Sequence, residues 1–205
     1  AIPITIIGAI LLGFTLPVTP LQILWINLVT AVALDLTLAF ETTEPGTMRR
    51  RPRSTGEPLL SGQLVWRICF VSALFMAAAF GIFFWALERG LPLETARTMV
   101  VNTIVVLEIF YLFSVRYVHG TSLTWTGVVG TPAVLIGVAT VVIAQAAFTY
   151  LPVLQGVFET RPIGLGDSLV ILGIGVALLL IVELEKRVGR WLFAGRPGHP
   201  ADPGA

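Results

Sequence analysis

Long runs without a charged side chain constrain this chain more than any other feature of its sequence. Residues 1–34, 68–87 and 168–182 contain no Asp, Glu, Lys or Arg, and residues 117–158 contain only a neutral His119. Of the 205 residues, 56% are hydrophobic and 12% are charged. Because a water-soluble domain of this size needs more polar surface, the runs predict membrane spans. The few, scattered cations also exclude a basic face for binding nucleic acid.

The spacing of these runs predicts an all-α fold, a polytopic membrane helical bundle. About 20 helical residues cross a bilayer core of about 30 Å, and Pro- and Gly-containing loops separate the apolar stretches. A shorter apolar run at residues 2–16 has no positively charged flank and begins at Ala1. We interpret it as a truncated first helix and the chain as a fragment, not as a signal peptide. Five stretches are long enough for full spans: residues 20–40, 65–87, 97–115, 131–151 and 164–183.

The distribution of Lys and Arg predicts the orientation of the bundle. Ten of the 13 cations lie in residues 41–67, 116–126 and 186–196, and the alternate loops hold only Arg89, Arg97 and Arg161. By the positive-inside rule, the loop 41–63 and the C-terminus are cytoplasmic. Residues 1–193 then form one transmembrane domain, and the Gly- and Pro-rich residues 194–205 form a disordered cytoplasmic tail.

Two carboxylates fall inside predicted spans, where insertion of a charge costs at least about 2.5 kcal/mol. Asp35 follows Asn27 and Thr30 in the stretch 20–40, and Glu108 lies near the middle of the stretch 97–115. Residues four apart on a helix drift by only about 40°, so Asn27 and Asp35 share a broad face with Thr30 at its edge. Three oxygen-bearing side chains are therefore expected to face one cavity.

These oxygens suggest a site for a hard cation or a proton, because carboxylate, amide and hydroxyl groups suit such ions and soft metals prefer sulfur. The predicted metal ligands are Asn27, Thr30, Asp35 and Glu108. The alternative is that each acid pairs with an Arg or a backbone donor inside the bundle, or is tolerated near an interface.

Other polar and small residues in the spans predict helix packing. Gln145 is the only strongly polar side chain in the stretch 131–151, and we expect it to form an interhelical hydrogen bond. Gly173, Gly175 and Ala177 are expected to form a surface for close helix contact.

A family resemblance appears in the first third of the chain. The stretch Leu16-Pro17-Val18-Thr19-Pro20 leads into Asn27-Leu28-Val29-Thr30, and the sequence Met48-Arg49-Arg50-Arg51-Pro52-Arg53 follows. This pattern resembles the C-terminal membrane region of cation-transporting P-type ATPases, of the calcium-pump-like or a related bacterial branch. The resemblance extends from residue 1 to about residue 193.

The resemblance implies roles for particular residues. Asn27 and Thr30 fall on cation-ligand positions of the family, and Glu108 resembles the glutamate of the eighth helix in calcium pumps. Ala31 stands where the calcium-pump pattern has an aspartate, and Asp35 follows one turn later, about 6 Å along the helix. Asp35 is therefore the acid on this stretch that could supply the displaced charge, and whether it does so is left open by the resemblance.

The resemblance also implies the function: the membrane half-domain of an ATP-driven cation pump, which supplies part of the ion-binding and translocation pathway. The chain contains no Asp-Lys-Thr-Gly phosphorylation sequence. It is therefore part of a translocase and not catalytic on its own, with no cofactor in this chain and ATP and magnesium implied for the full-length pump.

The expected partners are a transported cation (calcium, another alkaline-earth or alkali ion, or a proton), the missing N-terminal part of the pump and the lipid bilayer, with no nucleic acid. The expected location is the bacterial plasma membrane. Two alternatives remain open: a free-standing ion channel or secondary transporter, for which no internal repeat is found, and a non-transporting membrane scaffold.

Overall fold

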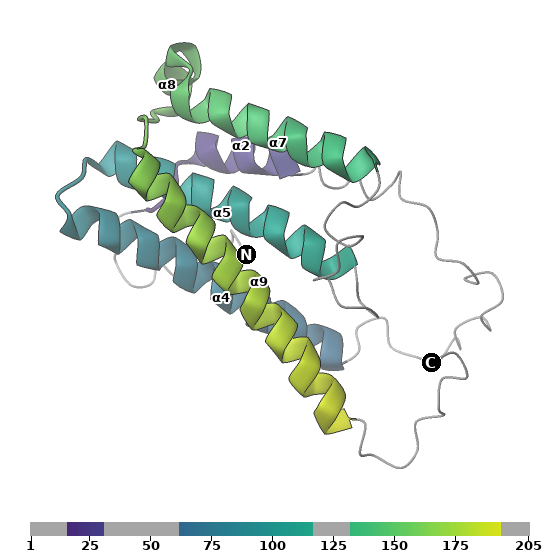
Figure 1. Ribbon diagram of the computed structural model, residues 1–205. Helices are drawn as coiled ribbons and strands as arrows, with labels where there is room; N and C mark the ends of the chain where they lie inside the picture. Colours follow the sequence, from purple (N-terminus) through teal and green to yellow (C-terminus); the bar gives the residue numbers. More distant parts are fainter. Residues whose placement is uncertain (1–15, 31–61, 117–131, 194–205) are drawn as a thin grey trace.

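The computed structural model describes residues 16–30, 62–116 and 132–193. Predictions that concern the other residues, including the truncated first helix, the loop 41–63 and the tail 194–205, lie outside the described residues. The described chain is helical, and its elements surround α5 (Figure 1). Their bounds are α2 (Pro20–Thr30), α4 (Gly62–Glu88), α5 (Leu93–Arg116), α7 (Pro132–Tyr150), α8 (Pro152–Phe158) and α9 (Leu165–Phe193).

Three of these helices are long and apolar enough to cross a membrane. The candidate spans are Val65–Glu88, Leu93–Ser114 and Leu165–Val188, and a fourth results if Leu135–Tyr150 and Pro152–Phe158 count as one broken span. The apolar part of α2, Pro20–Val29, is shorter. The all-α membrane fold is therefore confirmed, whereas five full spans stay a prediction.

The helix α5 packs between α4 and α9 and carries much of the core. Met99, Val100 and Val101 are inaccessible to solvent, and Leu107 joins a second buried cluster with Val182 of α9. The turn at Gly90, whose φ is +73°, reverses the chain between α4 and α5, so that the two helices run antiparallel (Figure 1). Glycine tolerates this left-handed backbone without steric cost.

One glycine sets the distance between α5 and α9. A Cβ atom on Gly175 would lie 2.6 Å from Phe110 and 2.7 Å from Val106, which is closer than atoms pack. Small residues let helix backbones approach in this way. The predicted close contact is confirmed at Gly175, but it is wrong at Gly173, where a Cβ would meet nothing within 4 Å, and Ala177 is exposed.

The bend between α7 and α8 has a local cause. Pro152 has no backbone N–H to continue the helical ladder, and the residue before a proline is driven into an extended conformation. Leu151 has φ −81° and ψ 119°, and the two helices meet at 78°. The short helix α8 was not predicted from the sequence.

The first turn of α2 is fixed at the same end of the bundle. Thr19 and Gln22 form a capping box: Thr19 N donates to Gln22 Oε1 at 3.1 Å, and Gln22 N donates to Thr19 Oγ1 at 3.3 Å. Pro20 at the first helical position needs no donor partner. Gln22 Nε2 also donates to the Phe158 carbonyl at 3.0 Å, which ties α2 to the last residue of α8.

The last helix is continuous. The sequence predicts that the helix continues beyond the span to Phe193, and α9 runs without a break from Leu165 to Phe193. Near its start, Asp167 accepts a hydrogen bond at 2.5 Å from Arg89, whose guanidinium also lies 4.4 Å from the centre of the Trp85 ring. This exposed ion pair connects the start of α9 to the end of α4.

Candidate functional site

Glu108 is the predicted ligand that the structure describes most fully. It lies inside the span Leu93–Ser114, and its Oε2 atom is buried with no hydrogen-bond partner in the described part of the chain. Helical spacing puts it on the stripe of α5 that carries Ile104 and Leu112. Both residues belong to the buried cluster that also contains Ile26 and Val29 of α2. An enclosed carboxylate oxygen without a donor is costly and requires an explanation.

The other predicted ligands are only partly described. Asn27 lies on α2 and is exposed, because Ile26 and Val29 take the face of α2 that packs on the described bundle. Thr30 is the last described residue of α2, and Asp35 lies outside the described residues. No hydrogen bond joins Asn27 to Glu108 within the described ranges. The proximity of the four ligands therefore stays a prediction.

A metal site built from several ionisable side chains is not found among residues 16–30, 62–116 and 132–193. These ranges hold no group of three or more His, Cys, Asp or Glu side chains in position to bind one ion. A cation bound at Glu108 would consequently depend on neutral oxygen ligands or on residues beyond the described ranges. Such mixed oxygen coordination is usual for hard cations.

Gln145 is confirmed as an interhelical hydrogen-bond partner. Its Oε1 accepts a hydrogen bond from Trp25 Nε1 at 3.2 Å, which joins α7 to α2. Indole nitrogen can only donate, so the Gln145 atom that faces it must be the oxygen. The Trp25 ring also stacks on Phe148 with centroids 5.0 Å apart. These contacts make Gln145 a packing residue of the α2–α7 joint.

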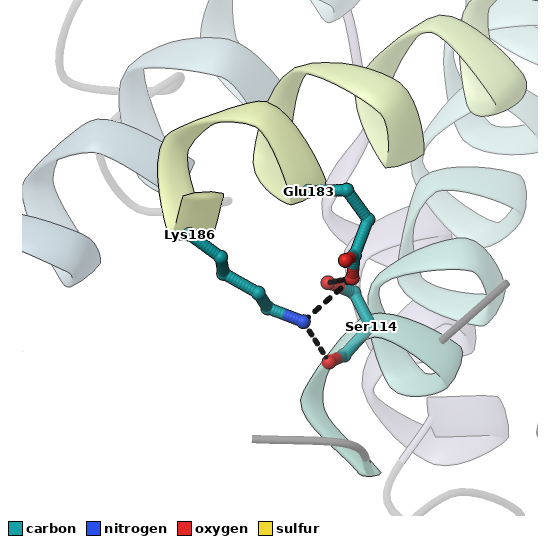
Figure 2. Close-up of polar contacts among 3 residues, drawn as sticks. All are labelled: Ser114, Glu183 and Lys186. Atoms are coloured by element: carbon teal, nitrogen blue, oxygen red, sulfur yellow. Dashed lines mark hydrogen bonds and ion pairs between the residues drawn. The ribbon is translucent and has the colours of Figure 1, made fainter. Parts of the chain in front are cut away.

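A second buried carboxylate lies at the far end of α5, where the sequence predicted only an interfacial continuation of the last span. Figure 2 shows Glu183 and Lys186 of α9 facing Ser114 of α5. Lys186 Nζ lies 2.7 Å from Glu183 Oε1 and donates to the Ser114 carbonyl oxygen at 2.5 Å, and Ser114 Oγ donates to Glu183 Oε1 at 3.3 Å. The side chains of Lys186 and Glu183 are only 8% and 4% exposed.

This group, Ser114, Glu183 and Lys186, is hereafter called the α5–α9 clasp. Lys186 supplies the positive charge that the buried Glu183 carboxylate requires, and it also satisfies a carbonyl in the last turn of α5, where helix carbonyls lack intrahelical partners. The i, i+3 spacing of Glu183 and Lys186 could have indicated the pair from the sequence. Because the Lys186 ammonium group already neutralises the Glu183 carboxylate, the clasp joins α5 to α9 and does not form a cation site.

Comparison with known proteins places these features in a family. The family model "Cation transporting ATPase, C-terminus" matches residues 15–188. A "Probable cation-transporting ATPase F" of Mycobacterium tuberculosis is 43% identical over 188 residues, which are 91% of this chain and 21% of that protein. "Cation-transporting ATPase pma1" of Synechocystis sp. is 34% identical over 77% of this chain and 18% of its own length.

The name of a more distant relative specifies an ion. "Calcium-transporting ATPase type 2C member 2" of Mus musculus is 27% identical over 88% of this chain and 19% of its own length. The chain thus spans about a fifth of the length of the relatives that it matches. Together with the membrane-spanning helices, the family match identifies the chain as an integral membrane protein that belongs to the family of cation-transporting ATPase C-terminal regions.

Proposed function

We propose that this chain supplies part of the cation-binding and translocation pathway of an ATP-driven pump, in which Glu108 is a direct ligand of the transported ion. Asn27 and Thr30 of α2, with Asp35 from the residues that follow, complete the ligand set. The phosphorylation and nucleotide-binding domains, which use ATP and magnesium, belong to the part of the pump outside this chain. The transported ion is a hard cation, with calcium as the first candidate because a relative bears that name.

The observation that carries the proposal is the enclosed Oε2 of Glu108. In the part of the chain that the structure describes, no donor and no cation satisfies this atom. The Glu183 carboxylate, by contrast, has Lys186 beside it. A carboxylate inside a span is expensive unless it is paired, and an ion that arrives during transport provides the missing pair. Exposed Asn27 leaves its amide for the same ion once the rest of the pump covers α2.

The proposed orientation follows the distribution of Lys and Arg. The end of the bundle that carries the clasp faces the cytoplasm, and the end that carries α8 and the Arg89–Asp167 pair faces the other side. The membrane is proposed to be a bacterial plasma membrane, since the two relatives of highest identity named above come from Mycobacterium tuberculosis and Synechocystis sp..

The proposal is tested in the full-length pump by Glu108→Gln, with Glu88→Gln as a matched control on an exposed carboxylate at the end of α4. Phosphoenzyme formation from ATP is measured against the concentration of calcium, and then of magnesium, sodium, potassium and protons. Loss of a charged ligand is expected to weaken binding of the transported ion, so that its half-saturating concentration rises at least about tenfold.

Asp35→Asn is measured beside Glu108→Gln. We expect this variant to have a weaker affinity for the same ion, because the Asp35 carboxylate is proposed to replace the aspartate that calcium pumps have at the position of Ala31. Wild-type cation dependence in both variants would contradict the proposed site. A free-standing channel would instead conduct ions in liposomes without ATP.

A further inference from the structure

The contacts of α9 with α5 lie near the height of the proposed cation ligand, on the face of α5 opposite Glu108. Gly175 packs against Val106 and Phe110, which flank Glu108 in the sequence at two residues on either side. The clasp then holds α5 again at Ser114, about 9 Å further along the axis from Glu108. The two contacts on α9 itself, at Gly175 and Lys186, are separated by about 16 Å of helix. Two points of attachment oppose both rotation and sliding of α5.

The two points differ in what they resist. At Gly175 the atoms of α9 and Phe110 are already in close contact, so α5 cannot turn toward α9 without a clash. At Ser114 the backbone carbonyl accepts a hydrogen bond from Lys186 and the hydroxyl donates one to Glu183, so α5 cannot slide or turn away without breaking both bonds. Rotation of α5 about its axis changes the direction of the Glu108 side chain by the same angle.

We infer that Lys186 is a positioning residue for the transported cation: through the clasp it fixes the rotation of α5 and hence the direction in which Glu108 presents its carboxylate. This inference rests on the proposed function, because it takes Glu108 to be a cation ligand. Lys186 itself does not contact the ion. The residue ties the affinity of the membrane site to the packing of the last helix.

The experiment uses the full-length pump and measures the half-saturating calcium concentration, or that of whichever ion supports phosphorylation, in Lys186→Met. Arg187→Met is the matched control, since it removes the neighbouring exposed cation from the same helix. We expect a two- to thirtyfold weaker affinity, on the order typical of coupling through packed elements, in Lys186→Met alone. Lys186→Arg is expected to restore the affinity to within about twofold, because guanidinium can donate to both oxygen acceptors.

A second pair of variants covers the case in which Lys186→Met cannot be purified in folded form. Gly175→Ala forces α5 and α9 apart at Val106 and Phe110, and Gly173→Ala adds the same methyl group where nothing lies within 4 Å. A weaker affinity in Gly175→Ala, with wild-type affinity in Gly173→Ala, supports the inference.

Failure of the inference and failure of the proposed function give different results. Lower thermal stability with unchanged cation affinity in both Lys186→Met and Gly175→Ala overturns the inference, because the clasp is then a structural fastening only. If Glu108→Gln also keeps wild-type cation affinity, the proposed function itself fails. Loss of affinity in Glu108→Gln with none in the α9 variants rejects the positioning role alone.

Discussion

Glu108 and Glu183 lie in neighbouring helices, each with an enclosed carboxylate oxygen, and they differ in what balances their charge. Glu183 lies beside Lys186, with the ammonium nitrogen 2.7 Å from Oε1, and Ser114 donates to the same oxygen. Glu108 has an enclosed Oε2 and forms no ion pair with a Lys or Arg in the described part of the chain. The difference separates two uses of a buried carboxylate: one holds helices together, and the other remains available to a cation.

The largest expected effect comes from removing the cation of the clasp. Lys186→Met leaves the Glu183 carboxylate buried without its ammonium partner, and breaking a buried ion pair in this way costs about 3–5 kcal/mol. Thermal unfolding of the purified pump should show a clearly lower transition temperature. The double variant Glu183→Leu with Lys186→Met should recover much of the loss, because apolar replacement of a whole pair is often neutral. A double variant as unstable as Lys186→Met would show that the unpaired charge of Glu183 is not the cause of the lost stability.

The second prediction is a change in stability of the opposite sign. Glu108→Gln removes a charge that has no partner in the described chain, so the resting protein without its cation should be as stable as the wild type or more stable by about 1 kcal/mol. Unfolding is followed in chelator and again with calcium present. Only the wild type should gain stability from the ion, by mass action on the folded state. A strongly destabilised Glu108→Gln in chelator would mean that Glu108 is a structural acid like Glu183.

The smallest effect is expected at the other end of α9. Arg89 and Asp167 also form an ion pair, but the Arg89 side chain is 45% exposed, so water screens the charges. Such pairs contribute about 0.2–1 kcal/mol, and Arg89→Gln should lower stability by no more than this. Its contact with the Trp85 ring adds to the same small total. Raising the salt concentration should reduce the difference between Arg89→Gln and the wild type, and it should leave the defect of Lys186→Met unchanged.

Hydropathy was sufficient to predict the three spans that the structure describes in α4, α5 and α9, because each must present about 20 apolar residues to lipid. Length and apolarity alone could not predict which glycine is a contact. Gly173 and Gly175 look alike in the sequence, yet only Gly175 faces α5, since two residues on a helix turn the side chain by about 200°. The helix α8 was missed for a similar reason: its seven residues, which begin with Pro152, are too few to form a recognisable periodic pattern.

The candidate site was predictable in its chemistry but not in its assembly. Glu108 stands out in the sequence as an acid in a span, and the structure encloses its Oε2 atom, while its role as a ligand stays a prediction. Glu183 was not recognised as buried, because its place beside Lys186 and Arg187 looks like a solvated helix end. Whether Asn27 approaches Glu108 depends on helix rotation, which no pattern in a single chain specifies.

The capping box and the bond from Gln22 to Phe158 make the first turn of α2 a pivot. A helix that is anchored at its start is displaced most at its far residues when it tilts, and Thr30 lies about 15 Å from Pro20 along the axis of α2. A tilt of about 10° therefore carries the backbone at Thr30 by roughly 2–3 Å, which is as long as a bond between calcium and oxygen. A displacement of this size at Thr30 is large enough to form or break the coordination of an ion.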